Sequence, residues 1–175
     1  KKKNYYFLSN NNKLDVKYLK RINPFLIFFP HWNFLVDKKI VEKFNCIGFH
    51  ATPLPYGRGG SPIQNMIIRG YKKSKLCAFK LTKKLDNGPI YLKKNFLLTG
   101  SGDDIFNRIY YLIFNMMYKL EKNIPKPQKQ IGKVFYFKRR KLKQGNLLKV
   151  NSVKEAYNLI RMLDISHVDY PKAFI

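Results

Sequence analysis

His50 and Asp86 are the two side chains whose types and positions suggest acid–base chemistry. His50 ends an apolar run and is followed at once by a loop dense in proline and glycine, and Asp86 precedes the turn-forming pair Asn87 and Gly88. A carboxylate beside an imidazole favours the imidazolium, or fixes the tautomer whose other ring nitrogen faces a substrate. Taken singly, each residue also has a structural explanation: the histidine as part of the packing at a strand end, and the aspartate as part of a turn. If the two meet, they form a general acid–base pair.

The loop behind His50, residues 51–60, is the only dense cluster of glycine and proline in the chain. Prolines hold a backbone extended, and glycines permit positive φ angles or a close approach of the backbone to a ligand. In an open parallel sheet, ligands bind beyond the carboxyl ends of the strands. The loop is therefore predicted to form one wall of a pocket whose reactive group is His50.

Alternating strand and helix patterns must position these residues. Apolar runs predict strands, and helical periodicity with capping residues such as Asp37, Ser61, Ser101 and Ser152 predicts helices. This order predicts an α/β fold with a Rossmann-like open, mostly parallel sheet and helices on both faces, as a single domain over residues 1–175. The expected strands are 5–8, 25–29, 46–50, 76–81, 90–98 and 133–138, and the expected helices are 14–22, 38–44, 62–69, a long helix that opens at 101–104, and 152–163.

Composition narrows the class of protein. The formal net charge is +25, which attracts phosphates, nucleic acid and acidic lipid headgroups. The simplest explanation is a compositional bias of the genome that places lysine at exposed positions. The alternative is a nucleic-acid-binding role, although the basic runs 1–3 and 137–143 lack a recognisable nucleic-acid-binding motif. Cys46 and Cys77 lie in apolar runs, which favours buried, reduced thiols in a cytoplasmic protein. The sequence shows no metal-site spacing, and its apolar runs are too short to span a membrane.

The stretch FHATPLPYGRGGSPIQ closely resembles the hallmark of the folate-dependent formyltransferases, the family of methionyl-tRNA formyltransferase and the sugar-nucleotide N-formyltransferases. The family pattern runs from Asn-x-His through Leu-Leu-Pro and Arg-Gly-x-x-Pro-x-Gln to a later Leu-Asp-x-Gly. The resemblance spans roughly residues 24–98, with a weaker echo at 160–175. The residues in register are His50, Thr52, Leu54, Pro55, Arg58, Gly59, Pro62, Gln64, Leu85, Asp86 and Gly88.

This resemblance implies transfer of the formyl group of 10-formyltetrahydrofolate to a primary amine, without a metal. His50 would stabilise the tetrahedral oxyanion and relay protons, while Asp86 holds and polarises His50. The pterin would lie between residues 28–34 and the 85–90 turn, and Arg58 would either shape the loop or contact an anionic group of the acceptor. The residues implied for the folate are Phe29, His31, Trp32, Leu85, Asn87 and Gly88, and those implied for the loop and substrate are Thr52, Arg58, Gly59 and Gln64.

One departure from the family pattern bears on catalysis. Gly48 stands where the family has an asparagine two residues before the histidine, so one hydrogen-bond donor to the oxyanion is missing. Loss of one such donor costs on the order of 3 kcal/mol. Either another residue substitutes, with Asn65, Asn33 and His31 as candidates, or the protein is slow or inactive. Pro53 and Pro89 also depart from the pattern and indicate a divergent branch.

The resemblance also bears on the ends of the chain and on the acceptor. The family's first strand and helix are not found ahead of residue 5, so the sequence is expected to be truncated at the N-terminus and possibly at the C-terminus. Without room for the additional barrel domain of the methionyl-tRNA enzyme, the favoured acceptor is an amino-sugar nucleotide or similar small amine. The alternatives are aminoacyl-tRNA, which suits the charge, and a catalytically inactive folate- or nucleic-acid-binding module. The sequence gives no prediction of oligomeric state.

Overall fold

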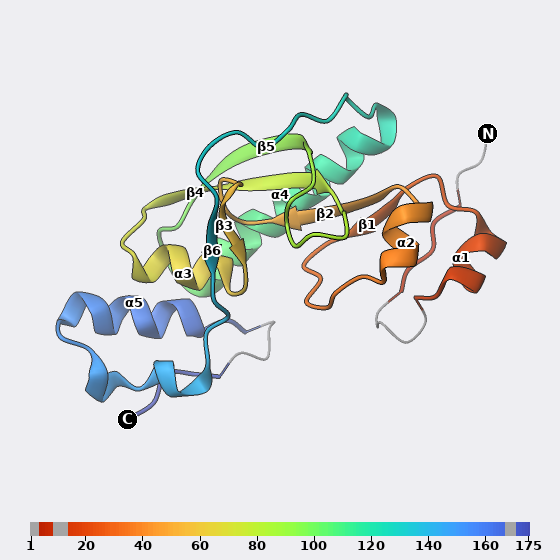
Figure 1. The fold of residues 1–175 in the computed structure, drawn as a ribbon. Coiled ribbons are helices and arrows are strands. Elements are labelled where there is room, and N and C mark those ends of the chain that lie inside the picture. Colours follow the sequence, from red (N-terminus) through yellow and green to blue (C-terminus); the bar gives the residue numbers. More distant parts are fainter. Residues whose placement is uncertain (1–3, 9–13, 167–170) are drawn as a thin grey trace.

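A four-stranded sheet forms the centre of the fold (Figure 1). The computed structural model describes residues 4–8, 14–166 and 171–175. In spatial order the strands are β1 (Ile27–Phe29), β2 (Cys46–His50), β4 (Lys73–Lys80) and β5 (Ile90–Leu97). The expected α/β class, with helices on both faces of the sheet, is confirmed.

The pairing within this sheet is mixed, where mostly parallel pairing was expected. β1 and β2 are parallel, but β4 is antiparallel to both β2 and β5. Residues 81–89 join β4 to β5, and a connection this short cannot carry a parallel crossover. The two strands therefore form a hairpin, which places Asp86 in the tight connection between them.

Helices cover the two faces of the sheet unequally. The helices α3 (Pro62–Ile68), α4 (Gly102–Lys122) and α5 (Val153–Leu163) pack with Ile47, Leu76 and Ala78 into one continuous core. The opposite face carries α1 (Val16–Ile22) and α2 (Lys38–Lys43) over β1, and a separate small cluster of Leu54, Cys77 and Phe79. Alternate residues of β4 point to opposite faces, as the period of a strand requires.

Local capping explains why the helices begin where the sequence predicts. Asp37 accepts a hydrogen bond from the backbone N–H of Lys39 at the start of α2, and Ser101 forms a capping box with Asp104 at the start of α4. Ser152 is the predicted N-cap of α5, and its hydroxyl accepts the backbone N–H of Glu155. Ser61 occupies the N-cap position of α3, but its hydroxyl accepts the N–H of Arg140, so it ties α3 to a distant segment.

A second, two-stranded parallel sheet was not predicted. It pairs β3 (Tyr56–Gly59), within the segment expected to be a loop, with β6 (Phe135–Phe137). Gly59 has a φ of +103°, and a side chain there would overlap the carbonyl oxygen of Phe137, so glycine is what allows the two strands to approach. Two short 3-10 helices, η2 (Leu142–Gly145) and η3 (Leu147–Lys149), follow β6.

The ends of the chain differ from expectation or lie outside the described residues. Residues 5–8 form no strand, although the hydroxyl of Tyr5 donates to Glu121 of α4. The basic run 1–3 and residues 167–170 of the predicted closing segment are outside the described part. Beyond that gap, the backbone of Phe174 pairs with Gly145 and Leu147. Within the described residues, no helix has the length and apolar character needed to cross a bilayer.

Candidate active site

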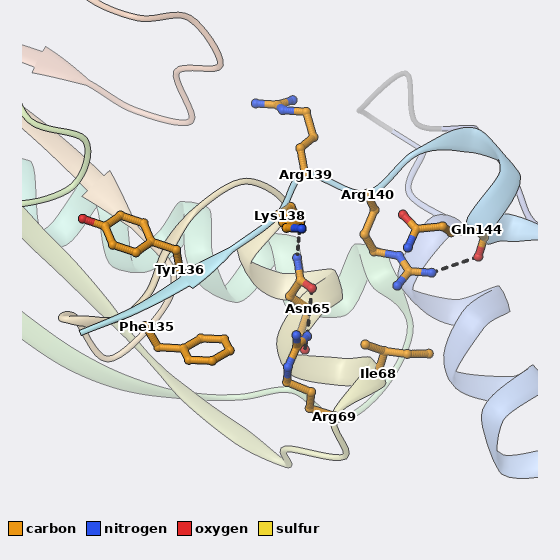
Figure 2. A pocket seen from close by; sticks show the side chains of 9 residues that line it. All are labelled: Asn65, Ile68, Arg69, Phe135, Tyr136, Lys138, Arg139, Arg140 and Gln144. Carbon is orange, nitrogen blue, oxygen red and sulfur yellow. Dashed lines mark hydrogen bonds between the residues drawn. The ribbon is translucent and has the colours of Figure 1, made fainter. Parts of the chain in front are cut away.

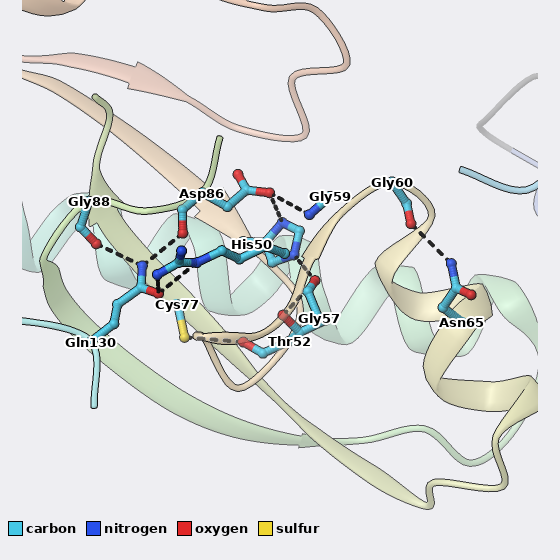
Figure 3. Close-up of polar contacts among 11 residues, drawn as sticks. His50, Thr52, Gly57, Gly59, Gly60, Asn65, Cys77, Asp86, Gly88 and Gln130 are labelled. Atoms are coloured by element: carbon cyan, nitrogen blue, oxygen red, sulfur yellow. Dashed lines mark hydrogen bonds and ion pairs between the residues drawn. The ribbon is translucent and has the colours of Figure 1, made fainter. Parts of the chain in front are cut away.

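The structure brings His50 and Asp86 together. His50 is the last residue of β2, and its Nδ1 lies 3.7 Å from Oδ2 of Asp86 in the β4–β5 hairpin connection (Figure 3). The same Oδ2 accepts a hydrogen bond of 2.8 Å from the backbone N–H of Gly59. The backbone of Asp86 has a φ of +46°, in the left-handed region that aspartate tolerates better than most residues. The carboxylate of Asp86 therefore faces the imidazole of His50 and is held in place by the loop that follows His50.

The other ring nitrogen of His50 is also engaged. Nε2 lies 2.7 Å from the carbonyl oxygen of Gly57, which accepts a second hydrogen bond from the hydroxyl of Thr52 at 3.2 Å. His50 is only 7% exposed, and its ring orientation is restricted by the hydrogen bond to Gly57 and by the longer contact with Asp86. Because the contact of Nδ1 with Asp86 is longer than a hydrogen bond, Nδ1 is the ring atom with room for another partner.

Side chains from β4 hold the loop that begins at residue 51. The hydroxyl of Ser74 donates to the carbonyl of Ala51, and the thiol of Cys77 donates to the carbonyl of Thr52. Burial raises the pKa of Cys77, so the thiol keeps its proton as a donor. Cys46 and Cys77 are both free and buried, as predicted, and burial raises the pKa of Cys46 to about 12.

Gln130 joins the two halves of the motif and was missed by sequence reasoning. Its Oε1 accepts hydrogen bonds from Nε and Nη2 of Arg58 at 3.1 and 2.7 Å. Its Nε2 donates to the backbone carbonyls of Asp86 and Gly88, each at 2.8 Å. Gln130 belongs to an irregular segment between α4 and β6 with no periodic pattern, so no local signal marks it. Arg58, only 6% exposed, thus stabilises the loop through a neutral partner.

Comparison with known proteins decides the family. No family model matches the chain. In sequence, it is 30% identical over 154 residues to methionyl-tRNA formyltransferase of Thermodesulfovibrio yellowstonii, covering 83% of this chain and 50% of that protein. In structure, it is 43% identical to methionyl-tRNA formyltransferase from Clostridium thermocellum, with a TM-score of 0.91 over 96% of this chain and 74% of that one. The chain belongs to the folate-dependent formyltransferase family.

Two more distant proteins share the fold. A 4-N formyltransferase from Francisella tularensis is 18% identical with a TM-score of 0.70, covering 93% of this chain and 75% of that one. HypX from Aquifex aeolicus in complex with tetrahydrofolic acid is 13% identical with a TM-score of 0.69, covering 83% of this chain and 27% of that one. The chain spans about half the length of the curated relatives it matches.

Apolar side chains fill the space beside Gly48, the position of the formyltransferase asparagine. A Cβ on this residue would lie 2.6 Å from Cδ2 of Leu81 and 3.2 Å from the ring of Phe79. An asparagine would therefore have to displace the end of the Leu81 side chain. Leu81 and Phe79 thus occupy the space that an asparagine side chain at position 48 would need.

Asn65 lacks a free N–H for the role of substitute donor. Its Nδ2 donates to three backbone carbonyls, those of Gly60, Ser61 and Lys138, each at 3.0 Å. An amide nitrogen has two hydrogens, so both are committed. Asn65 instead clamps the end of the loop that follows His50 to the segment after β6. Its neighbour Gln64 is a buried residue of α3 and is 1% exposed. The Nε2 of Gln64 has no hydrogen-bond partner in the described part of the chain.

The other candidate donors lie around the end of β1. The ring of His31 packs edge-on against Phe106 and Tyr110 of α4, with centroids 5.2 and 6.0 Å away. Burial lowers the pKa of His31, which favours its neutral form. Asn33 is exposed. His31 is thus turned toward α4, on the opposite face of the sheet from the cluster of Leu54, Cys77 and Phe79.

The residues implied for the folate occupy two segments. Trp32 packs edge-on against Phe29 at 5.5 Å, and its buried Nε1 has no hydrogen-bond partner among the described residues. In the hairpin connection, Leu85 is 49% exposed and Asn87 is exposed. Gly88 is buried, and a side chain there would overlap the carbonyl oxygen of Lys80. The turn is therefore pinned to β4 by its glycine and presents its preceding residues outward.

The described residues contain no group of three or more histidine, cysteine, aspartate or glutamate side chains placed to hold a metal ion.

Proposed function

We propose that this chain carries the catalytic part of an enzyme that transfers a formyl group from 10-formyltetrahydrofolate to a primary amine. The observation that carries the proposal is the contact of His50 with Asp86 at the end of β2, held on both sides by the backbone of residues 57–59. Family membership supplies the reaction class, and the unpartnered Nε1 of Trp32 supplies a buried donor suited to a polar heterocycle.

In this proposal His50 acts on the oxygen that gains negative charge. When bound, 10-formyltetrahydrofolate would supply the formyl group: the bond from the formyl carbon to the amine forms, the bond to N10 breaks, and the proton lost by the amine leaves with tetrahydrofolate. Because Nε2 donates to the carbonyl of Gly57, Nδ1 of His50 is the ring nitrogen with room for the substrate oxygen, and it donates to that oxygen when both ring nitrogens carry a proton. The Asp86 carboxylate stabilises the ring when it carries the additional proton, and Gly59 keeps that carboxylate in place. With Gly48 lacking a side chain, His50 is the one side-chain donor assigned to this oxygen.

The acceptor supported best is an aminoacyl-tRNA. The relatives reported above with 30% and 43% identity are named methionyl-tRNA formyltransferases, whereas the 4-N formyltransferase is 18% identical. These comparisons favour the tRNA alternative over the amino-sugar nucleotide preferred from the sequence. The net charge of +25 also suits a polyanionic acceptor. A sugar nucleotide is the second candidate, because a sugar N-formyltransferase from Shewanella shares the fold over 89% of this chain.

A transfer assay with two acceptors tests the proposal. The protein is mixed with 10-formyltetrahydrofolate and either methionyl-tRNA or a 4-amino-sugar nucleotide, and the formylated product is measured by mass spectrometry. Binding of a stable analogue of the donor is measured by calorimetry in parallel. We expect saturable donor binding, transfer to methionyl-tRNA, and a rate at least about 100-fold lower in His50→Ala.

Each other result has a definite meaning. Transfer only to the amino sugar would replace the acceptor and keep the enzyme. Donor binding without transfer to either acceptor would favour an inactive folate-binding module. A folded protein that does not bind the donor would overturn the formyltransferase proposal. Asn151→Ala serves as the control, because that side chain is exposed and lies outside the segments proposed for folate binding and proton transfer.

A further inference from the structure

A cavity of about 560 Å³ lies beside the loop of residues 51–60, between α3 and the segment that runs from β6 into η2 (Figure 2). This volume lies within the range of small-molecule binding sites. We call it the basic cavity. It is lined by Asn65, Ile68, Arg69, Phe135, Tyr136, Lys138, Arg139, Arg140 and Gln144.

The lining of the basic cavity carries four cationic side chains and no acidic one. In the described part of the chain, none of the four forms an ion pair with a carboxylate. Arg69 donates to Asn65 and Arg140 donates to the carbonyl of Gln144, so their partners are neutral. Burial and the charge of Arg69 together lower the pKa of Arg140. The positive charge around this hollow is therefore uncompensated, and an anion bound there would relieve the repulsion.

Arginine is concentrated at this place. The chain has seven arginines among its 35 lysines and arginines, and three of the seven line the basic cavity. A fourth, Arg58, lies behind the cavity wall, with Nη1 3.5 Å from the hydroxyl of Tyr136. A general bias toward lysine does not produce such a cluster. The planar guanidinium group binds phosphate through two parallel hydrogen bonds, which lysine cannot do.

The basic cavity shares a wall with the catalytic pair. Gly59 donates its N–H to Asp86, and the next residue, Gly60, accepts the amide of Asn65, which lines the cavity. Figure 3 shows these two contacts at consecutive residues of the same loop. A side chain on Gly60 would meet the backbone of Arg139 at 2.7 Å, so the cavity segment packs directly on the loop. A molecule bound in the basic cavity would thus lie close to the loop that orients Asp86.

We propose that the basic cavity binds phosphate groups of the amine acceptor and so holds its amine near His50. This inference rests on the proposed function for its statement about the amine, but the phosphate binding itself does not depend on the reaction. The phosphates are either those of an RNA backbone or the diphosphate of a nucleotide. Both present the same anionic oxygens to Arg139, Arg140 and Lys138.

Binding measurements on a double variant test the proposal. Lys138→Gln/Arg139→Gln removes two charges from exposed lining residues, and Lys17→Gln/Lys20→Gln removes two from exposed positions on α1, at the other end of the molecule (Figure 1). The probes are a short RNA hairpin with a single-stranded 3′ end and, separately, uridine diphosphate. Fluorescence anisotropy of the labelled hairpin and calorimetry of the nucleotide are recorded at several salt concentrations.

We expect the cavity variant to bind at least one probe about tenfold more weakly, and the α1 control to bind both as the wild type does. If the hairpin is the affected probe, the slope of log affinity against log salt should become shallower by about 1.4 to 1.8, for two lost phosphate contacts. An effect on the hairpin assigns the site to RNA, and an effect on uridine diphosphate alone assigns it to a nucleotide.

Equal affinities of the cavity variant and the α1 control for both probes would overturn the proposal. Calorimetric titration with the folate analogue separates this failure from a failure of the proposed function. We expect both double variants to bind the analogue as the wild type does, which also shows that they are folded. Loss of analogue binding in the wild type would count against the formyltransferase proposal and leave the phosphate measurements as they stand.

Discussion

The two faces of the central sheet are built in different ways. On one face, α3, α4 and α5 pack with the strands into a single continuous core. On the other, the buried residues divide into two small clusters, and the proline- and glycine-rich loop carries the polar contacts of His50. Hydrophobic packing of the first face fixes the strands, while the second holds its residues through hydrogen bonds to backbone groups. The continuous core and the proposed chemistry thus lie largely on opposite faces, and this separation can be tested.

The largest expected effect concerns the packing itself. Ile105→Ala in the continuous core should lower the free energy of unfolding by about 4 kcal/mol, because the surrounding helices cannot collapse into the space. Ile40→Ala, equally buried but in a small cluster, should cost about 2 kcal/mol because its neighbours can relax. Urea denaturation of both variants measures the difference. Equal losses would contradict the distinction between the faces.

On the opposite face, Asp86→Asn should affect the reaction far more than the fold. The amide oxygen can still accept the N–H of Gly59, but the negative charge beside His50 is gone. We expect formyl transfer to slow by about 100-fold, with the free energy of unfolding changed by less than about 1 kcal/mol. Steady-state kinetics and denaturation are measured together, with Asp164→Asn as the control for an exposed carboxylate. An Asp86→Asn variant that is strongly destabilised would make this residue chiefly structural.

Gly48→Asn tests whether the packing around position 48, on the second face, leaves room for an asparagine side chain. The new side chain would meet Leu81, so we expect a loss of about 1 to 2 kcal/mol in the free energy of unfolding. Gly48→Asn/Leu81→Ala should recover part of this loss by making room, and should transfer formyl groups faster than Leu81→Ala alone. Denaturation and single-turnover rates of the three variants measure both effects. A double variant no more stable than Gly48→Asn would show that Leu81 is not the obstacle.

The smallest expected effect is the pH dependence due to His31, whose ring packs on α4. Burial lowers its pKa in the folded state, so below about pH 6.5 the unfolded chain binds more protons at this site than the folded one. The contribution of His31 to stability is therefore complete above that pH and declines as the pH falls toward the lowered value. His31→Asn, which tolerates the positive φ of this position, should show a flatter pH dependence of unfolding between pH 7.5 and 5. Parallel curves for wild type and variant would contradict this.

The features predictable from sequence were those fixed by neighbours along the chain. Ser101 and Ser152 mark the starts of α4 and α5 because a cap acts within three residues. The meeting of His50 and Asp86 followed from the family resemblance, since both residues fall on its spaced motif. Such signals need no knowledge of the packed structure.

The features that were missed depend on contacts between distant segments. Strand β3 exists because Tyr56 pairs with Phe135, and nothing local distinguishes it from a loop. Gln130 has its role only because Arg58 and Asp86 are brought to it by the fold. Asn65 was a candidate donor in the sequence analysis, but its amide N–H groups are engaged by backbone carbonyls, one of which belongs to the distant Lys138.

The pairing of β3 with β6 also has a consequence for the timing of synthesis. A ribosome makes His50 and Asp86 long before it makes Gln130 and Phe137, which hold the loop between them. A nascent chain that has emerged only as far as α4 would contain both proposed acid–base residues, yet lack the strand and the glutamine that order them. The site becomes competent only when the later part of this chain has emerged and folded back. Premature termination within this region would thus yield a fragment that carries the motif without a functioning site.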